Sequence, residues 1–286
     1  MTREALVKGM RRCKISEILV FVPTYNSEKY LKQCLDSVLQ QTFQDWECVI
    51  SDDASTDNSV EIAREYEKRD SRFKVLTHSH NVGAANNWNR AKENNSSLAT
   101  KILCADDYLY IDALEKQIRL LKNFKTAIVF SEREILLPSG RLLHPKLPKY
   151  GQSLTFNEAF TLYIKSGRNI FGEPVGVLFN TQSLIESKPF SPKFEFALDT
   201  YCYAAIAHDQ RVTFDANVVG VFRVSKSQWS YQLRREQFFH NFEFIDHLIL
   251  DEGIKINRFN VMLGKIKVVI ANMIRILVYK LMKENK

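Results

Sequence analysis

Two adjacent aspartates, Asp106 and Asp107, stand where the apolar run of the segment TKILCADDYLY ends. Neighbouring carboxylates repel each other, and each loses favourable hydration when a strand end buries it. The pair is therefore expected either to face water or to hold something positive. A cap on the helix expected near Ile111 would explain one of the two acids, but it does not explain both.

Three other apolar runs are followed by polar loops in the same way. The runs are Ile18–Val22, Trp46–Ile50 and RFKVLTH, and the residues that follow them include Asn26, Asp52, Asp53, Asn81 and Gly83. For any one of these loops, a polar connection that caps a helix is a sufficient explanation. Four such loops, two of them with an aspartate pair, favour a shared binding site instead.

The segments between these runs have the spacing of helices. Apolar residues in Glu28–Gln41 and in Ser59–Arg69 recur every three or four positions, and Ser55 or Asp57 could cap the second helix. Strands that alternate with helices of this length predict a parallel sheet covered on both faces. Such sheets bind ligands at the carboxyl ends of their strands, which is where the polar loops fall.

The later part of the chain predicts further strands and helices. In order these are a helix at Ile111–Phe124, a strand that starts a hairpin at TAIVFSEREILL, a buried strand at GEPVGVLF, a helix at Thr200–Ala207, a β-rich segment at VTFDANVVGVFRVS, and two long helices at Tyr231–Leu250 and Ile256–Lys283. We therefore expect an α/β domain over residues 1–230 and a helical extension over residues 231–286.

Composition places the chain among globular proteins. Of its 286 residues, 45% are hydrophobic and 26% are charged, which excludes a disordered or fibrous chain. The five cysteines include no CxxC pair, so neither a disulfide framework nor a zinc site is indicated, and a reducing cytosol fits best. The apolar run ILVFVP is too short for a signal peptide, and no run is long enough for a membrane span. A cytoplasmic protein is expected.

Positive charge gathers at the C-terminal end of the chain. The formal net charge is +7, and the last 56 residues hold ten Lys or Arg against six Asp or Glu. In Ile256–Lys283, apolar residues recur on one helix face, while Lys267, Arg275 and Lys283 lie on another. Such a helix can lie on the inner face of an anionic cell membrane, pack on the domain, or bind a second subunit in a homo-oligomer. No RRM, KH or zinc-finger pattern accompanies the charge, and no nucleic-acid partner is expected.

The residues at the strand ends suit a nucleotide diphosphate. The first loop, VPTYNSEKY, has no GxGxxG pattern and the chain has no Walker A pattern, so backbone amides are not expected to cradle the phosphates. Carboxylates can neutralise a diphosphate through Mg²⁺ or Mn²⁺ instead. Tyr25 offers a flat face for a base, and Asp53 offers an acceptor for a base N–H.

The same segments resemble a known family. The block VFVPTYNSEKYLKQCLDSVLQQTFQDWECVISDDASTDNSVEI closely resembles the N-terminus of family 2 glycosyltransferases of the GT-A fold, bacterial inverting enzymes that use nucleotide-sugar donors. The resemblance continues through NVGAANNWNRA and the DxD-like ADD, and more loosely through FGEPVGVLF, ALDTYCYA and VFRVS to about residue 230. It implies an α/β, Rossmann-like and mostly parallel sheet with helices on both faces, followed here by a C-terminal helical extension.

The resemblance also implies roles for the matched residues. Pro23, Thr24 and Tyr25 would line the pocket of the base, Asp53 would bond to the base, and Asn81, Asp106 and Arg223 would complete the nucleotide-sugar site, with Asp106 at the ribose or sugar. Asp107 would bind the Mn²⁺ or Mg²⁺ ion. Ala105, Trp88 and Ser225 depart from the family's pattern, because many members have aspartate, arginine and histidine at these three positions.

Inverting transfer is a single displacement at the anomeric carbon, and it needs a base for the acceptor hydroxyl. Asp199 in ALDTYCY matches the catalytic aspartate of the family, although Leu198 replaces the acid that precedes it; an N-cap for the helix Thr200–Ala207 is the alternative. Glu173 and Pro174 would form part of the acceptor side. The expected activity is sugar transfer from a UDP-sugar to a glycan or lipid-linked glycan in O-antigen or capsule synthesis. A catalytically inactive protein that binds the same nucleotide or glycan is the alternative.

Overall fold

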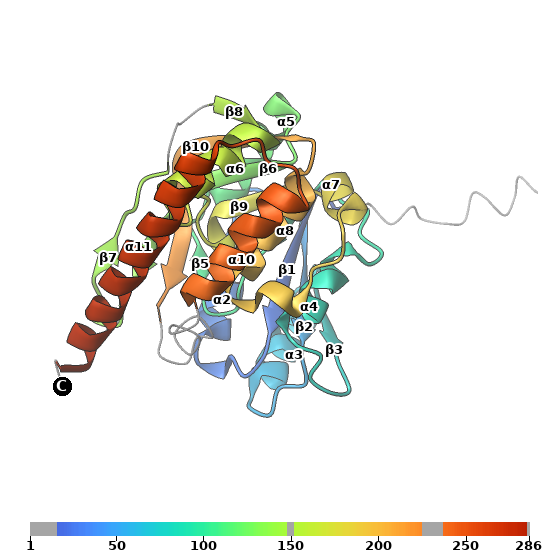
Figure 1. Ribbon diagram of the computed structural model, residues 1–286. Coiled ribbons are helices and arrows are strands. Elements are labelled where there is room, and N and C mark those ends of the chain that lie inside the picture. The colour runs from blue at the N-terminus through green and yellow to red at the C-terminus, as the bar shows by residue number, and fades with distance from the viewer. Residues whose placement is uncertain (1–15, 148–151, 225–236, 285–286) are drawn as a thin grey trace, which may run out of the picture.

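A single sheet runs through the protein, whose computed structural model describes residues 16–147, 152–224 and 237–284 (Figure 1). The strand order is β3-β2-β1-β4-β9-β6-β10-β5, and β7 and β8 pair with β6 and β10. The strands are β1 (Ile18–Thr24), β2 (Trp46–Asp52), β3 (Phe73–Thr77), β4 (Ala99–Ile102), β5 (Tyr108–Leu109), β6 (Ile128–Leu136), β7 (Leu142–Leu143), β8 (Gln152–Thr155), β9 (Val177–Asn180) and β10 (Arg211–Arg223).

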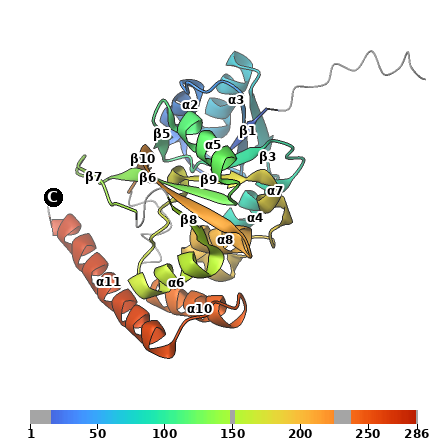
Figure 2. The same ribbon diagram turned by 90° about the horizontal axis from the view of Figure 1, so that it is seen from above.

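Helices cover both faces of this sheet, as predicted (Figure 2). On one face lie α2 (Glu28–Leu39), α3 (Ser59–Arg69) and α5 (Ala113–Phe124), and on the other lie α4 (Ala84–Asn89), α6 (Phe156–Ser166), α7 (Thr181–Glu186) and α8 (Leu198–Ala207). Short 3₁₀ turns occur at η1 (Arg90–Lys92), η2 (Pro174–Gly176) and η3 (Pro192–Ala197). Each face has its own buried apolar cluster, because each helix turns one apolar stripe toward the strands.

The first half of the sheet has the predicted parallel arrangement. Strand β1 pairs in parallel with both β2 and β4, and β2 pairs in parallel with β3. In this register Thr24 lies beside Asp52, and Asp52 lies beside Thr77. The carboxyl ends of these strands therefore open at one edge of the sheet, and the polar loops gather there.

The second half is mixed rather than parallel. Strand β9 runs antiparallel to both β4 and β6, whereas β10 runs parallel to β6 and antiparallel to β5 and β8. The expected strand in GEPVGVLF is also shorter than predicted, because Pro174–Gly176 forms a 3₁₀ turn and only Val177–Asn180 is β-strand. Proline lacks the backbone N–H that a central strand needs, which accounts for the delayed start.

Two C-terminal helices, α10 (Gln237–Leu250) and α11 (Arg258–Glu284), form a further layer outside α6 and α8 (Figure 2). Helix α10 buries Phe244 and Leu248, and the ring of Phe244 lies edge-on to Tyr163 of α6 at 5.8 Å. Helix α11 buries Val268. The boundary expected between residues 230 and 231 falls at residues 225–236, outside the described residues.

Two glycines bring α6 and α11 into close contact. Gly167 ends α6 in a left-handed conformation (φ 65°), and a Cβ there would lie 2.5 Å from the Cβ of Lys267. On the facing helix, a Cβ on Gly264 would lie 2.2 Å from the carbonyl oxygen of Ile164. The first half of α11 thus packs on the domain. This was one of the three alternatives that the sequence left open. None of the described helices is both long and apolar enough to cross a membrane.

The substitution Gly264→Ala tests this packing, because the packing decides whether the variant is less or more stable than the parent. In an unpacked helix, glycine to alanine stabilises by about 0.5–1 kcal/mol, because alanine has the higher helix propensity. Here the new methyl group meets the Ile164 carbonyl, and overpacking of this kind destabilises by about 1–3 kcal/mol. We expect thermal unfolding to show a lower Tm for the variant. A higher Tm would mean that α11 does not dock on α6.

Candidate active site

The loops that leave β1 and β2 are tied to each other at the carboxyl edge of the sheet. Asn26 has a positive φ of 48°, its backbone N–H donates to the Ser55 hydroxyl at 2.9 Å, and its side-chain oxygen accepts from the Thr56 N–H at 2.8 Å. Asp57 accepts from the Glu28 N–H at 3.0 Å. The N-cap of α3 is Asn58, not Ser55 or Asp57 as expected, although Asp57 accepts from the Ser59 N–H at 3.0 Å.

Asp53 holds the third loop of this edge in place. Its carboxylate is buried and accepts from the backbone N–H groups of Val82 and Gly83, at 2.7 and 3.0 Å. Asn81 is exposed, and its side-chain oxygen also accepts from the Gly83 N–H, at 3.1 Å. Each carboxylate oxygen can accept a second hydrogen bond, so these contacts leave Asp53 able to accept from a base. That contact stays a prediction.

The residues expected around a base lie at the carboxyl end of β1 and differ in burial. Tyr25 is 50% exposed and presents its ring to solvent, and Pro23 is half-buried. Thr24 is buried, and its hydroxyl donates back to the Val22 carbonyl at 3.2 Å. The Tyr25 ring is thus the most accessible surface of the three. Their contacts with a nucleotide remain untested.

Asp106 and Asp107 lie in a tight turn that follows β4 after three residues. The Asp107 N–H donates to the Cys104 carbonyl at 3.0 Å, and the Asp107 side chain is only 1% exposed. Its Oδ1 accepts from the Arg223 N–H at 2.9 Å, whereas its Oδ2 has no hydrogen-bond partner among the described residues. Burial and the neighbouring Asp106 carboxylate raise the pKa of Asp107 well above its usual range. A buried carboxylate oxygen without a donor is what a cation would satisfy.

The capping alternative for the aspartate pair is wrong. Helix α5 begins at Ala113, two residues after the expected Ile111, and its N-cap is Asp112. Neither Asp106 nor Asp107 is placed at that position. The ligand atoms of Cys104, Asp106 and Asp107 instead lie within 4.8 Å of one another, a spacing at which they could hold a metal ion.

Arg223, at the end of β10, brings a positive charge to the aspartate pair. Its Nε donates to the Asp106 carbonyl at 3.0 Å, and its guanidinium group lies 4.4 Å from the centre of the Tyr30 ring. The residue therefore joins the last strand of the sheet to the turn after β4. Arg223 thus lies beside Asp106. Its contact with a nucleotide sugar, which the resemblance implied, stays a prediction. Ser225 lies outside the described residues.

Asp199 lies in the first turn of α8, which begins at Leu198 and not at Thr200. The N-cap is Ala197, so the expected alternative, Asp199 as N-cap, is wrong in position. Its Oδ1 still accepts from the Thr200 N–H at 2.7 Å, and its Oδ2 accepts from the Asn169 side-chain amide at 3.3 Å. Burial raises the pKa of Asp199 to about 7. The Thr200 hydrogen bond lowers this pKa, and the nearby Glu173 charge raises it further.

Glu173 lies near both Asp107 and Asp199 and is paired with a buried arginine. Its Oε2 accepts from Arg133 Nε at 2.5 Å, and the negative charge of Glu173 contributes to the raised pKa of both Asp107 and Asp199. The preceding Gly172 has a φ of 82°, and a Cβ there would lie 3.0 Å from the Arg133 guanidinium. Pro174 is buried. The structure thus brings Glu173 to the site, while the acceptor role of Glu173 and Pro174 is untested.

Sequence reasoning missed Arg133 and Asn169. Asn169 donates to both Asp199 and the Gly172 carbonyl, and accepts from the Gly172 N–H. Asn169 thereby fixes the Asp199 carboxylate relative to the Glu173 loop. A signal for Arg133 was present in the run AIVFSEREILL, because a cation inside a predicted buried strand needs an anionic partner. Asn169 carried no comparable signal.

A family model matches a large part of the chain. Residues 19–184 match the model described as glycosyl transferase family 2, and this range contains β1 to β4, both aspartate pairs and Glu173. Asp199 and Arg223 lie beyond it. The match therefore covers the strands that position the predicted nucleotide and metal residues.

Curated relatives agree with the family model. TuaG of Bacillus subtilis (strain 168), named for teichuronic acid biosynthesis, is 34% identical over 142 residues, which are 50% of this chain and 56% of TuaG. The Escherichia coli protein WfgD, named a UDP-Glc:alpha-D-GlcNAc-diphosphoundecaprenol beta-1,3-glucosyltransferase, is 28% identical over 199 residues, which are 68% of this chain and 72% of WfgD. The chain thus spans only part of these relatives.

Solved structures share the fold. The S. aureus TarS fragment 1–349 in complex with UDP superposes with a TM-score of 0.64 and 20% identity, covering 88% of this chain and 70% of that one. The mannosyltransferase PcManGT from Pyrobaculum calidifontis, in complex with GDP-Man and Mn²⁺, superposes with a TM-score of 0.65 and 18% identity, covering 90% of this chain and 71% of that one. These likenesses establish the GT-A architecture of the sheet and its helices.

Replacement of Asp107 by asparagine is expected to stabilise the protein when no divalent cation is present. Because folding raises the pKa of this acid, stability is lost as the pH rises above the unfolded pKa of about 4. Asp107→Asn removes that loss, and we expect a gain of about 1–3 kcal/mol at pH 7. Added Mn²⁺ should raise the Tm of the parent protein and leave the variant unchanged.

The measurement is thermal unfolding with a chelator and then with Mn²⁺. Asp112→Asn is the control, because Asp112 lies outside the aspartate turn and loses only a partly exposed ion pair with Lys116, and such pairs contribute at most about 1 kcal/mol. A parent Tm that does not respond to Mn²⁺, Mg²⁺ or Co²⁺ would contradict the assignment of Asp107 to a cation.

Proposed function

The chain belongs to glycosyl transferase family 2, and on this premise we propose that it is an inverting glycosyltransferase. Its donor is a nucleotide-diphosphate sugar with UDP as the nucleotide. Its acceptor is a saccharide or a lipid-linked saccharide in the synthesis of a cell-surface polysaccharide. The observation that carries this proposal is that the Glu173 charge acts on two acids, Asp107 and Asp199, whose hydrogen bonding suits each to a different task.

Asp107 suits the diphosphate side of the donor. One of its carboxylate oxygens is occupied by the Arg223 N–H, and the other is buried without a partner among the described residues. These residues fit a bound Mn²⁺ or Mg²⁺, with Asp107 as the ligand and Asp106 beside it at the ribose or sugar. When bound, the ion supplies positive charge to the leaving diphosphate. Arg223 adds a second positive charge at the same edge of the sheet.

Asp199 suits the acceptor side, because a general base works best when its pKa lies near the working pH. A pKa of about 7 leaves a substantial fraction ionised at neutral pH, and it makes the carboxylate a stronger base than an exposed aspartate. Asn169 and the Thr200 N–H hold the two oxygens in a fixed orientation. Asp199 accepts the proton of the attacking hydroxyl, while the bond between the anomeric carbon and the diphosphate breaks.

The choice of donor and acceptor rests on similar proteins. WfgD is named for a UDP-glucose donor and a diphosphoundecaprenol-linked acceptor, and TarS has been solved with UDP and with UDP-GlcNAc. TuaG is named for the synthesis of another cell-surface polymer, teichuronic acid. These names support a UDP-sugar and a surface polysaccharide such as O-antigen or capsule.

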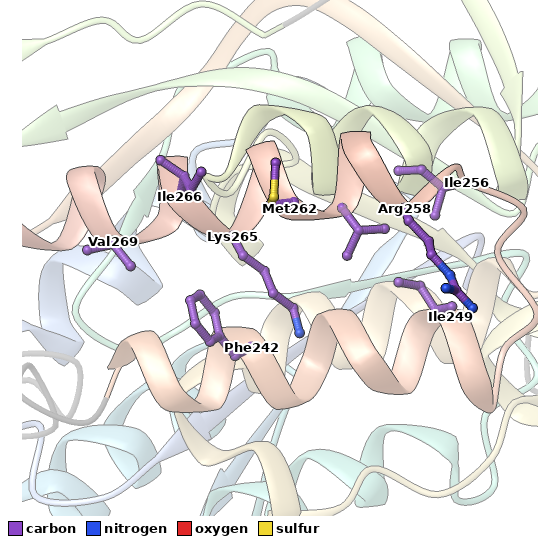
Figure 3. Close-up of a pocket in the computed structure, with 9 residues that line it drawn as sticks. Phe242, Ile249, Ile256, Arg258, Met262, Lys265, Ile266 and Val269 are labelled. Carbon is purple, nitrogen blue, oxygen red and sulfur yellow. The ribbon is translucent and has the colours of Figure 1, made fainter.

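A basic, partly apolar helix supports a site of action at the inner face of the cell membrane. The side chains of Phe259, Met262, Ile266, Ile270 and Met273 are exposed at intervals of three or four residues along α11, and so form one stripe. Beside it, a groove of about 590 Å³ lies between α10 and α11, with an almost wholly apolar lining that includes Phe242 and Ile249 (Figure 3). Lys265 and Arg258 border this groove.

An anionic bilayer matches both the apolar stripe and its charge. An amphipathic helix lies in the interface with its apolar face buried among lipid chains and its basic residues near the headgroups. The net charge of the chain is positive, and Arg258 is exposed at the start of α11. Lys265 pairs with Asp246 at 2.6 Å, and Lys267 Nζ donates to the Lys165 carbonyl at 2.9 Å. The enzyme is thereby held in the cytoplasm next to a lipid-linked acceptor.

Asp199→Asn is expected to lower turnover by about 10²–10⁴-fold, because an amide cannot accept the proton of the acceptor hydroxyl. Donor affinity, measured by calorimetry with UDP and Mn²⁺, should stay close to that of the parent. The parent rate should rise with pH through about pH 7 and then level off, since only the ionised carboxylate acts as a base. The variant should lack this rise.

The parent and the variant are compared with a panel of UDP-sugars and the lipid-linked acceptor. Turnover of the variant within a few-fold of the parent would show that Asp199 is not the base and serves only as a hydrogen-bond acceptor, for example of the Thr200 N–H, which asparagine can also accept. Nucleotide binding by the parent without any transfer or donor hydrolysis would favour the alternative of a binding protein.

Removal of the apolar stripe is expected to release the protein from membranes. The double substitution Phe259→Ser and Met273→Ser should weaken binding to phosphatidylglycerol vesicles by at least about tenfold, because two exposed apolar side chains lose their burial in lipid. High salt should weaken binding of the parent as its Lys and Arg contacts are screened. Ile111→Ser is the matched control, since Ile111 is equally exposed but lies before α5.

Vesicle sedimentation measures the binding, and gel filtration measures the oligomeric state of the same variants. Binding that survives the double substitution would contradict the membrane contact. If the parent is a dimer that the double substitution dissociates, and vesicle binding is absent, the stripe is a subunit interface instead.

A further inference from the structure

Cys104 precedes Asp106 by two residues, and its thiol lies near both aspartates. The Cys104 sulphur and one carboxylate oxygen from each of Asp106 and Asp107 all lie within 4.8 Å of one another. Cys104 is half-buried and also packs against the apolar cluster on one face of the sheet. A second, independent observation points to a ligand here: Asp107 is 1% exposed, and its Oδ2 has no hydrogen-bond donor among the described residues.

We infer that Cys104 supplies a sulphur ligand to the divalent cation of this site, and that the site therefore prefers transition-metal ions such as Mn²⁺ and Co²⁺ over Mg²⁺. The inference rests on the proposed function for the presence of a cation at Asp107. It goes beyond that function, because a thiolate beside two carboxylates changes which cation the site selects.

The distances and the ligand chemistry are compatible with a shared ion. Metal bonds to thiolate and carboxylate are about 2.3 and 2.0–2.2 Å long, so opposed ligands are separated by up to about 4.5 Å, close to the observed limit. Coordination forms a metal–sulphur bond, and the thiol proton passes to water. Carboxylate oxygens accept Mg²⁺ and Mn²⁺ alike, whereas a thiolate is a soft ligand that disfavours Mg²⁺.

The backbone near Cys104 holds the thiol in place. The Cys34 thiol of α2 donates to the Cys104 carbonyl at 3.7 Å, and the same carbonyl accepts from the Asp107 N–H at 3.0 Å. Both contacts go to backbone atoms and leave the Cys104 sulphur unoccupied by them. Replacement of the Cys104 side chain therefore changes the ligand set without removing the turn that presents Asp106 and Asp107.

The direct test is the absorption spectrum of the full-length chain titrated with Co²⁺ and UDP. A thiolate ligand produces a sulphur-to-cobalt charge-transfer band in the near ultraviolet, whereas carboxylates do not. We expect this band in the parent protein, and its loss in Cys104→Ser and in Cys104→Asp. Cys48→Ala is the matched control, because Cys48 is a buried thiol of β2 outside the aspartate turn. Every protein also carries Cys13→Ser, so that the N-terminal thiol contributes nothing.

Metal preference provides a second readout. UDP affinity is measured by calorimetry with Co²⁺ and with Mg²⁺, and the ratio of the two affinities should fall by at least about tenfold in Cys104→Asp, because aspartate restores an all-oxygen site. A Co²⁺-loaded parent without the band, a band that persists in Cys104→Ser, or an unchanged ratio would each overturn the sulphur ligand. If UDP still binds with Mg²⁺ or Mn²⁺ in those cases, the proposed function stands; if no cation supports UDP binding, both fail.

Discussion

Parallel pairing of β1 with β2 and β4 is the constraint on which the rest of the site depends. Parallel strands end at the same edge, so Thr24 and Asp52 lie side by side there, and the turn after Ile102 opens next to them. The loops then fasten to one another, with Asp53 holding the loop at Val82 and Gly83. These hydrogen bonds join the loops at the shared edge into one surface.

Desolvation is the second physical effect that shapes this surface. The buried Asp107 and the half-buried Asp199 both have raised pKa values, so each is less favourable in its ionised form than it would be in water. The nearby positive charges of Arg133 and Arg223 oppose this effect without removing it. Acids with raised pKa values cluster at functional sites, because a bound cation or a transferred proton can neutralise their charge.

Helix α11 carries two different surfaces. Its Gly264 and Val268 side contacts α6, while Met262, Ile266 and Ile270 remain exposed on another side. Docking against α6 fixes the orientation of the helix, and thereby the orientation of the exposed stripe. The amphipathic pattern in the sequence was compatible with packing on the domain and with contact to a membrane. In the structure one side of α11 packs on α6, and the apolar stripe on another side is exposed to solvent.

The sequence by itself determined the elements and the acidic residues of the edge. Hydrophobic periodicity located β1, β2, α2 and α3, because burial of one face repeats at fixed spacing. Periodicity says nothing of pairing partners, and only the tertiary structure decided that β9 runs antiparallel and that Pro174 delays its start. The roles of Arg133 and Asn169 were likewise decided in three dimensions. A buried ion pair and an oriented carboxylate require residues that are distant in the chain, and their contact energies appear only when the fold brings them together.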